Sequence, residues 1–203
     1  MARKNENPIK RAYTYSEVVR LWRFCSSESQ NQIAAALDAA KKPEWFAGKE
    51  TPENLNLLSY GALDDLATIA KRTGVDPMLE AVSLIMDVDK ETAAGQNAFD
   101  VFGLGKWIAK EVERINKLFA AITPHYSSEE IAAGVRSLNF GSFGVLDWYA
   151  HRQGIADQNQ VRDVAWVRIY TCMANDNQKA EYEKRLNKQY QQKYKARNGR
   201  NHV

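Results

Sequence analysis

TYSEVVRLWRFC, residues 14–25, carries the pattern from which the fold class of this chain can be predicted. Thr14 and Glu17 stand in the Ser/Thr-x-x-Glu order of a capping box, in which each side chain accepts a hydrogen bond from a backbone N–H at the start of a helix. The residues that follow repeat with the three- and four-residue spacing of one helix face, whose apolar members are Val18, Leu21, Trp22 and Cys25. An amphipathic helix directly after Thr14 is therefore expected.

Similar helix signals recur along the whole chain. SSEE, residues 127–130, is a second capping box, and Asp76 followed by Pro77 is typical of a helix start. Strand signals are nearly absent, because no segment alternates apolar and polar residues between turns. The sequence predicts an all-α fold, a multi-helix orthogonal or bundle-like domain of about eight to ten helices with a long polar C-terminal helix.

Glycines mark the expected interruptions of these helices. Gly103 and Gly105 lie inside a long helical pattern and are expected to break or kink it. Gly141 is expected to end a helix by adopting a positive φ. The rings of this stretch are then expected to pack in the core at a helix–helix corner; they are Phe140, Phe143, Trp148 and Tyr149.

Four segments are expected from the order of these signals. ANDN, residues 174–177, is interpreted as a turn before the last helix. The predicted segments are a disordered basic arm (1–12), an N-terminal helical hairpin (13–47), a main helical body (53–175), and a basic C-terminal helix and tail (176–203).

Composition is typical of a soluble globular protein. The chain has 203 residues, of which 44% are hydrophobic and 26% are charged. The basic N-terminus has no apolar signal-peptide core, and no apolar run is long enough for a membrane span. Cys25 and Cys172 are expected to be reduced core thiols. A cytoplasmic location is expected.

Residues with catalytic or metal-binding potential are few. Asp147 and His151 are four residues apart and would share a helix face, which is half of a nucleophilic catalytic arrangement. A surface ion pair or a helix-capping contact is the favoured interpretation, and a hydrolase is a third hypothesis. The remaining histidines, His125 and His202, are distant in sequence. No catalytic, cofactor-binding or metal-ligating residues are predicted, and the chain is not expected to be an enzyme.

The C-terminal segment carries the strongest functional signal. Residues 179–203 contain eight Lys/Arg and two Glu, a net charge of +6 that leaves −3 for the rest of the chain. Three interpretations are open: a solvated helix that leans on the body, a helix that docks on an acidic protein or an equivalent chain, and a helix that contacts nucleic-acid phosphates. The candidate partner-binding residues are Tyr182, Lys184, Arg185, Lys188, Tyr190, Lys193, Tyr194, Lys195 and Arg197.

NFGSFGVLDWYAHRQG (139–154) and VAWVRIYTCMANDNQKAEYEKRL (164–186) are the stretches that carry a family resemblance. The chain resembles the small all-helical accessory proteins encoded among phage and prophage structural genes, including tail-assembly chaperones. The shared features are a helical body, a polar helical end rich in lysine and glutamine, and two reduced cysteines. The resemblance implies binding to other virion or tail components during assembly, without a cofactor.

The functional prediction from the sequence is a non-enzymatic protein-interaction or assembly protein, with a phage virion or tail-assembly component as its narrower form. The expected partners are other protein subunits, including virion or tail components, and self-association is left open. The alternative is a nucleic-acid-associated accessory protein that binds phosphates through its basic C-terminal helix. No membrane partner is expected.

Overall fold

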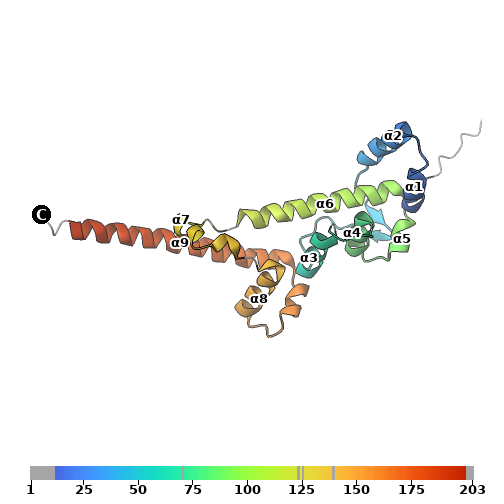
Figure 1. Ribbon diagram of the computed structural model, residues 1–203. Coiled ribbons are helices and arrows are strands. Elements are labelled where there is room, and N and C mark those ends of the chain that lie inside the picture. The colour runs from blue at the N-terminus through green and yellow to red at the C-terminus, as the bar shows by residue number, and fades with distance from the viewer. Residues whose placement is uncertain (1–11, 70, 123, 125, 139, 200–203) are drawn as a thin grey trace, which may run out of the picture. The chain divides into compact units, whose positions relative to one another are not determined.

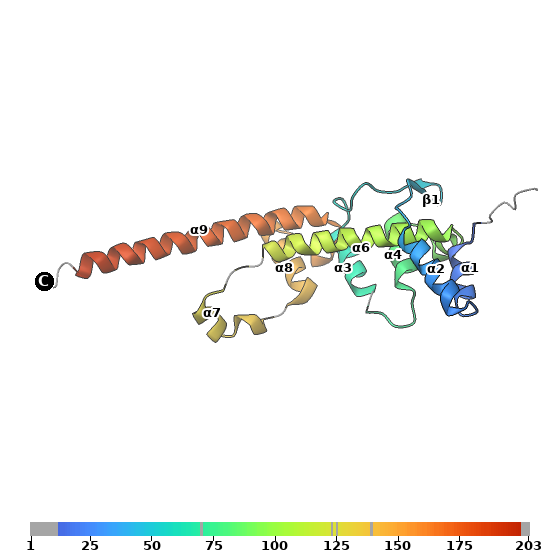
Figure 2. The ribbon, with the colours of Figure 1, turned by 90° about the horizontal axis from the view of Figure 1, so that it is seen from above.

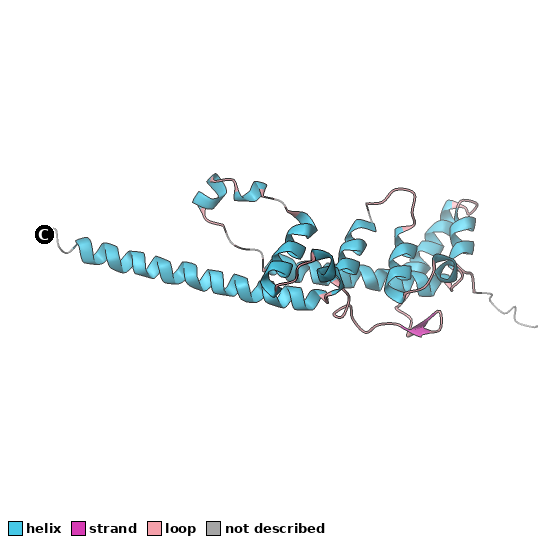
Figure 3. Cartoon of the chain, turned by 90° about the horizontal axis from the view of Figure 1, so that it is seen from below, coloured by secondary structure: helices cyan, strands magenta, loops and turns pink. Residues whose placement is uncertain are grey.

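The computed structural model describes residues 12–69, 71–122, 124, 126–138 and 140–199. Within these residues the chain forms nine α-helices, two short 3₁₀ helices and one two-stranded antiparallel hairpin, so the predicted all-α fold is confirmed (Figure 3). The predicted disordered arm, apart from Ala12, lies outside the described residues. No helix of the described part is long and apolar enough to cross a membrane.

The chain divides into two units, and the division passes through α3 and α6. Unit 1 comprises residues 1–55 and 65–113, and unit 2 comprises 56–64 and 114–203. The elements, of which Figure 1 labels the α-helices, are α1 (Tyr15–Trp22), α2 (Ser27–Asp38), β1 (Trp45–Phe46), β2 (Lys49–Glu50), α3 (Tyr60–Ile69), α4 (Pro77–Met86), α5 (Lys90–Ala94), α6 (Ala98–Ala121), α7 (Ser128–Ala132), η1 (Val135–Ser137), α8 (Gly141–Gln153), η2 (Gln158–Asp163) and α9 (Trp166–Gly199).

Capping side chains start the helices at the predicted positions. Thr14 and Glu17 form the reciprocal capping box of α1, and Ser127 and Glu130 form that of α7. Asp76 caps α4 by accepting hydrogen bonds from two backbone N–H groups. These three helix starts were predictable because a cap depends on residues within one turn of each other.

Tyr15 joins α1 to the start of α4 inside unit 1. Its ring is buried, and its hydroxyl donates a hydrogen bond of 2.5 Å to Oδ2 of Asp76. Burial, and then this hydrogen bond, raises the pKa of the Tyr15 phenol above its ordinary value. The ring also packs against Phe102 of α6, with 5.5 Å between centroids. Asp76 therefore serves both as the cap of α4 and as the acceptor for α1.

The two glycines of α6 do not interrupt it, so the predicted break is wrong. The helix continues from Ala98 to Ala121, and Figure 2 shows it without a break. The glycines instead allow close contacts, because a Cβ on Gly103 would lie 1.9 Å from the backbone oxygen of Lys41. A Cβ on Gly105 would lie 2.7 Å from Cγ of Met78. Packing in unit 1 therefore uses these glycines as helical residues that lack a side chain.

Unit 2 has its own hydrophobic core. Leu146, Tyr149 and Ala150 of α8 pack with Val161 of η2 and Ile169 of α9. Beside this cluster, the buried ring of Trp166 contacts the rings of Phe119 and Tyr170, with centroids 6.0 and 6.1 Å away. The first turn of α9 is therefore fixed by aromatic packing.

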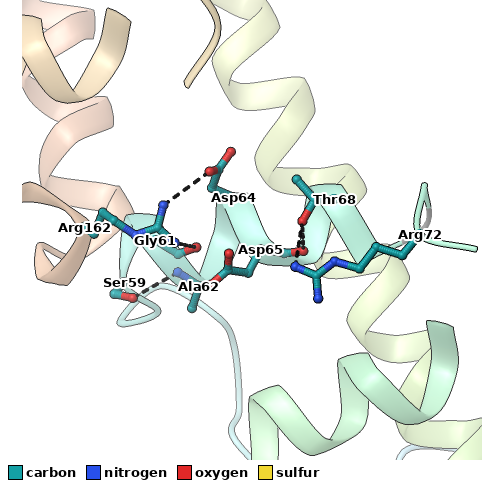
Figure 4. Close-up of polar contacts among 8 residues, drawn as sticks. All are labelled: Ser59, Gly61, Ala62, Asp64, Asp65, Thr68, Arg72 and Arg162. Carbon is teal, nitrogen blue, oxygen red and sulfur yellow. Dashed lines mark hydrogen bonds and ion pairs between the residues drawn. The ribbon is translucent and has the colours of Figure 1, made fainter. Parts of the chain in front are cut away.

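A polar contact holds η2 against the first turn of α3 in unit 2. Figure 4 shows Arg162 directed toward Asp64 and the backbone oxygen of Gly61, with nitrogen–oxygen distances of 3.5 and 3.4 Å. A Cβ on Gly61 would lie 2.9 Å from Cβ of Arg162, so the glycine permits this approach. The backbone of Val164 accepts a hydrogen bond from Tyr60, and Trp166 donates one to Leu58. These contacts position the segment that leads into α9.

The predicted corner around Gly141 differs from the structure. Gly141 has a positive φ of 56°, but it begins α8 rather than ending a helix. Phe140 and Phe143 are 71% and 61% exposed, so their predicted core packing is wrong. A Cβ on Gly144 would lie 2.5 Å from Cβ of Phe140, which explains the glycine at this position. Tyr149, one helical turn or more further along, is buried as expected.

Candidate interaction surface

The first part of α9 is held by unit 2. Trp166 and Ile169 are buried, and Cys172 and Met173 are partly buried against the cluster of α8. Arg152 of α8 reaches both carboxylate oxygens of Asp176, at 2.8 and 2.9 Å. The helix is continuous through residues 174–177, so the predicted turn is wrong and the terminal helix is an extension of a buried one.

The second part of α9, from Tyr182 onward, is mostly exposed where its side chains are described. Every residue from 187 to 195 is exposed, and so is Arg197. All nine candidate partner-binding residues belong to this helix and are exposed, and the three tyrosines among them are each more than half exposed. Figure 1 shows α9 as one unbroken helix toward the C-terminus. The helix presents these side chains without a cover from the described part of unit 2.

Tyrosines and a leucine form a spiral stripe on this part of the helix. Tyr182, Leu186, Tyr190 and Tyr194 follow one another at four-residue intervals. Because an α-helix turns by about 100° per residue, each interval advances the stripe by about 40° around the axis. The stripe rises about 18 Å over its length. We call these four residues the tyrosine stripe.

Cations surround the tyrosine stripe. Residues 184–197 contain six Lys/Arg and no Asp or Glu. Lys179 and Glu183 form an exposed i,i+4 pair with 4.0 Å between Nζ and Oε1, so the last acidic side chain of α9 lies just before this segment. The field of the exposed helix is therefore that of a cationic rod, which attracts anionic partners over the Debye length of about 8 Å at physiological salt.

Lys184 differs from the other candidates because it contacts α7. Its Nζ lies 3.6 Å from Oε1 of Glu130. The backbone N–H of Ser127, and then Lys184, lowers the pKa of the Glu130 carboxyl. An exposed pair of this kind contributes little to stability, so Lys184 can exchange Glu130 for another anion at small cost.

Asp147 and His151 are both exposed on α8. Oδ1 of Asp147 accepts a hydrogen bond of 3.2 Å from the side chain of Gln158. His151 precedes Gly154, the left-handed residue that ends the helix. Asp147 and His151 therefore lie on the solvent-exposed surface of α8, near its C-terminal end.

The described residues contain no candidate metal site, because no group of three or more His, Cys, Asp or Glu side chains converges among them. Both cysteines are free thiols and partly buried.

Comparison of the chain with protein-family models, with curated proteins and with solved structures finds no match.

A second apolar surface was missed by reasoning from the sequence. Leu21 and Trp22 were expected in the core because they share the apolar face of α1, but they are 40% and 36% exposed. They line a groove between α1, α2 and the start of α6. The sequence of α2 could have indicated this exposure. Its run of alanines offers little apolar area to cover Leu21 and Trp22, and Leu37 is its buried residue.

Proposed function

We propose that the protein is a non-enzymatic interaction protein that joins other protein subunits through the exposed second part of α9. What supports this is one observation: residues 184–197 carry six cations and no acid around the tyrosine stripe, whose three rings are exposed, on a helix whose first turns are fixed in a core. Tyrosine and arginine are enriched at the energetic centres of protein interfaces. A surface that carries charges of one sign favours a partner surface of the opposite sign. An acidic protein surface is the matching partner.

The narrower form of the proposal is an assembly protein of phage origin, similar to tail-assembly chaperones and acting in the host cytoplasm or the virion. It rests on the resemblance in helical character and in the polar helical end. Neighbouring genes test it: virion structural genes beside this one would support the narrower form, and their absence would contradict it while leaving the interaction surface to be tested separately.

Site-specific photo-crosslinking tests the interaction surface. A photoreactive residue in place of Tyr190 is expected to crosslink one discrete protein in the producing cell, and the complex should reform from purified components. Thr171, exposed on the first part of the same helix, is the matched control position and should not crosslink it. Neutralising Lys193 and Lys195 to Gln should weaken the reformed complex. Equal crosslinking at both positions, or none at Tyr190, would contradict the proposal.

Nucleic acid is the second candidate partner, favoured by the same cations interleaved with rings that can stack on bases. Titration with duplex and single-stranded DNA at two salt concentrations separates it from the first. Binding with a steep log–log salt dependence that disappears on deletion of residues 179–203 would support it. Absence of binding at low salt would exclude it.

A further inference from the structure

Unit 1 carries an apolar groove between α1, α2 and the first turn of α6, which we call the α1–α2 groove. Its larger hollow has a volume of about 740 Å³. A second hollow, of about 480 Å³, lies beside α1 and shares Val18, Trp22 and Leu37 with the first. The groove is mostly apolar, and the larger hollow is lined among others by Tyr13, Leu21, Trp22, Ile33, Leu37 and Phe99.

The side chains of this groove are poorly covered within the described part of the chain. Tyr13 is 55% exposed, Trp22 is 36% exposed and Phe99 is 49% exposed. Since an aromatic residue has roughly 150–250 Å² to bury, these three rings alone leave on the order of 300 Å² exposed. That is in the range of the largest apolar patches on monomers, which are commonly functional.

We propose that the α1–α2 groove of one copy binds the tyrosine stripe of α9 from a second copy. This inference rests on the proposed function, since it names the partner of the same helical surface. A helix with apolar side chains at i, i+4 and i+8 is the ordinary ligand of an apolar groove. The stripe supplies three rings and one leucine, and the groove supplies uncovered rings and aliphatic side chains.

Charge complementarity selects a second copy as the occupant. Unit 1, residues 1–55 and 65–113, contains fourteen Lys/Arg and sixteen Asp/Glu, a net charge of −2, whereas residues 184–197 carry six positive charges and no negative ones. A second cationic helix would repel the first, so the α9 segments do not suit each other. The small net negative charge of the unit that bears the groove attracts the cationic helix, and each chain carries both partners.

The contact is heterologous, because the groove and the stripe are different surfaces. Each copy would then use its groove for one neighbour and its stripe for another, which yields an open chain of copies or a closed ring. An association of this kind grows with concentration and weakens with salt.

Sedimentation of the full chain over a range of concentrations tests the inference. The expected result is concentration-dependent association. Leu21→Lys places a charge in the groove, and the double variant Tyr190→Ser with Tyr194→Ser removes half of the stripe. Serine and tyrosine have similar helix propensities, so the helix is retained. Each variant is expected to raise the dissociation constant at least about tenfold, as for central interface aromatics.

Matched controls separate the proposed contact from general effects. Trp45→Lys changes an exposed ring of unit 1 outside the groove, and Gln192→Ser changes α9 outside the stripe. Both are expected to associate as the unchanged chain does. Circular dichroism of every variant checks that the helices are intact.

Mixing the two defective variants provides the decisive measurement. The Leu21→Lys chain keeps an intact stripe and the tyrosine double variant keeps an intact groove. An equal mixture should therefore form a 1:1 complex at a concentration at which each variant alone is monomeric. A monomeric wild-type chain, control variants that weaken association equally, or a mixture that remains monomeric would each overturn the inference. If Tyr190 nevertheless crosslinks a different protein, the proposed function stands and only this inference fails.

Discussion

Replacing Gly103 by Ala would improve helix propensity in α6 but would create a steric clash with a neighbouring segment. Alanine is more favourable than glycine in a helix interior by about 1 kcal/mol, so propensity alone predicts a more stable protein. The new Cβ would lie 1.9 Å from the backbone oxygen and 2.5 Å from the backbone carbon of Lys41. Since carbon–oxygen contacts are normally about 3.3 Å or longer, the chain at Lys41 would have to move by more than about 1 Å.

The expected net effect of Gly103→Ala is a loss of stability. Overpacking in a well-packed region costs about 1–3 kcal/mol, and the upper end applies because backbone rather than a flexible side chain must move. Subtracting the gain in propensity leaves a decrease of about 2 kcal/mol in the free energy of unfolding. Gly105→Ala is the matched control, because its Cβ would meet the flexible side chain of Met78 at 2.7 Å. Its stability should stay within about 1 kcal/mol of the unchanged chain.

Urea denaturation followed by tryptophan fluorescence measures both variants, since Trp107 lies on the same helix. Gly103→Ala should unfold at a lower urea concentration than Gly105→Ala. A Gly103→Ala protein as stable as the unchanged chain would refute the close approach of Lys41 to α6. Equal losses in both variants would indicate a general effect of methyl groups on this helix instead.

Three further substitutions test unit 2. Ile169→Ala removes a fully buried side chain and should lower the free energy of unfolding by about 2–5 kcal/mol in urea titrations; a loss below about 1 kcal/mol would contradict the described core. Lys184→Met removes the exposed contact with Glu130 and should leave the urea midpoint unchanged, and a clear decrease would show that α7 depends on this pair. Tyr60 has its pKa raised to about 12 by burial and then by the charge of Asp64. The unfolded chain ionises this phenol near pH 10, so native stability is full below pH 10 and falls between about pH 10 and 12. Tyr60→Phe should make this fall shallower in stability measurements across that range, and an unchanged slope would refute the shift.

Local signals account for the parts of the fold that were predictable. The caps at Thr14, Asp76 and Ser127 start helices where expected, because a capping side chain and its N–H donors lie within a few residues. Core membership of Ile169 and Trp166 also follows from a wide apolar band on one helix.

Predictions failed where a local signal competed with distant contacts. Gly103 is a weak helix residue, and α6 continues through it because the bare backbone lets Lys41 approach. Residues 174–177 are typical of a turn, yet α9 continues through them, with Asp176 held by Arg152 of α8. In both cases a contact far away in sequence accompanies the helix that local propensity disfavours.

The sequence by itself determined the fold class, the main helix starts and the cationic, tyrosine-bearing end of α9, since each depends on spacing within a few turns of one helix. Tertiary structure alone decided which apolar faces are covered. Leu21 and Phe140 have the apolar character of core residues, and they are exposed because no described segment packs over them. Burial of an apolar face requires a distant segment of the chain to pack against it. An amphipathic pattern predicts that the helix has an apolar face, but it does not identify that segment.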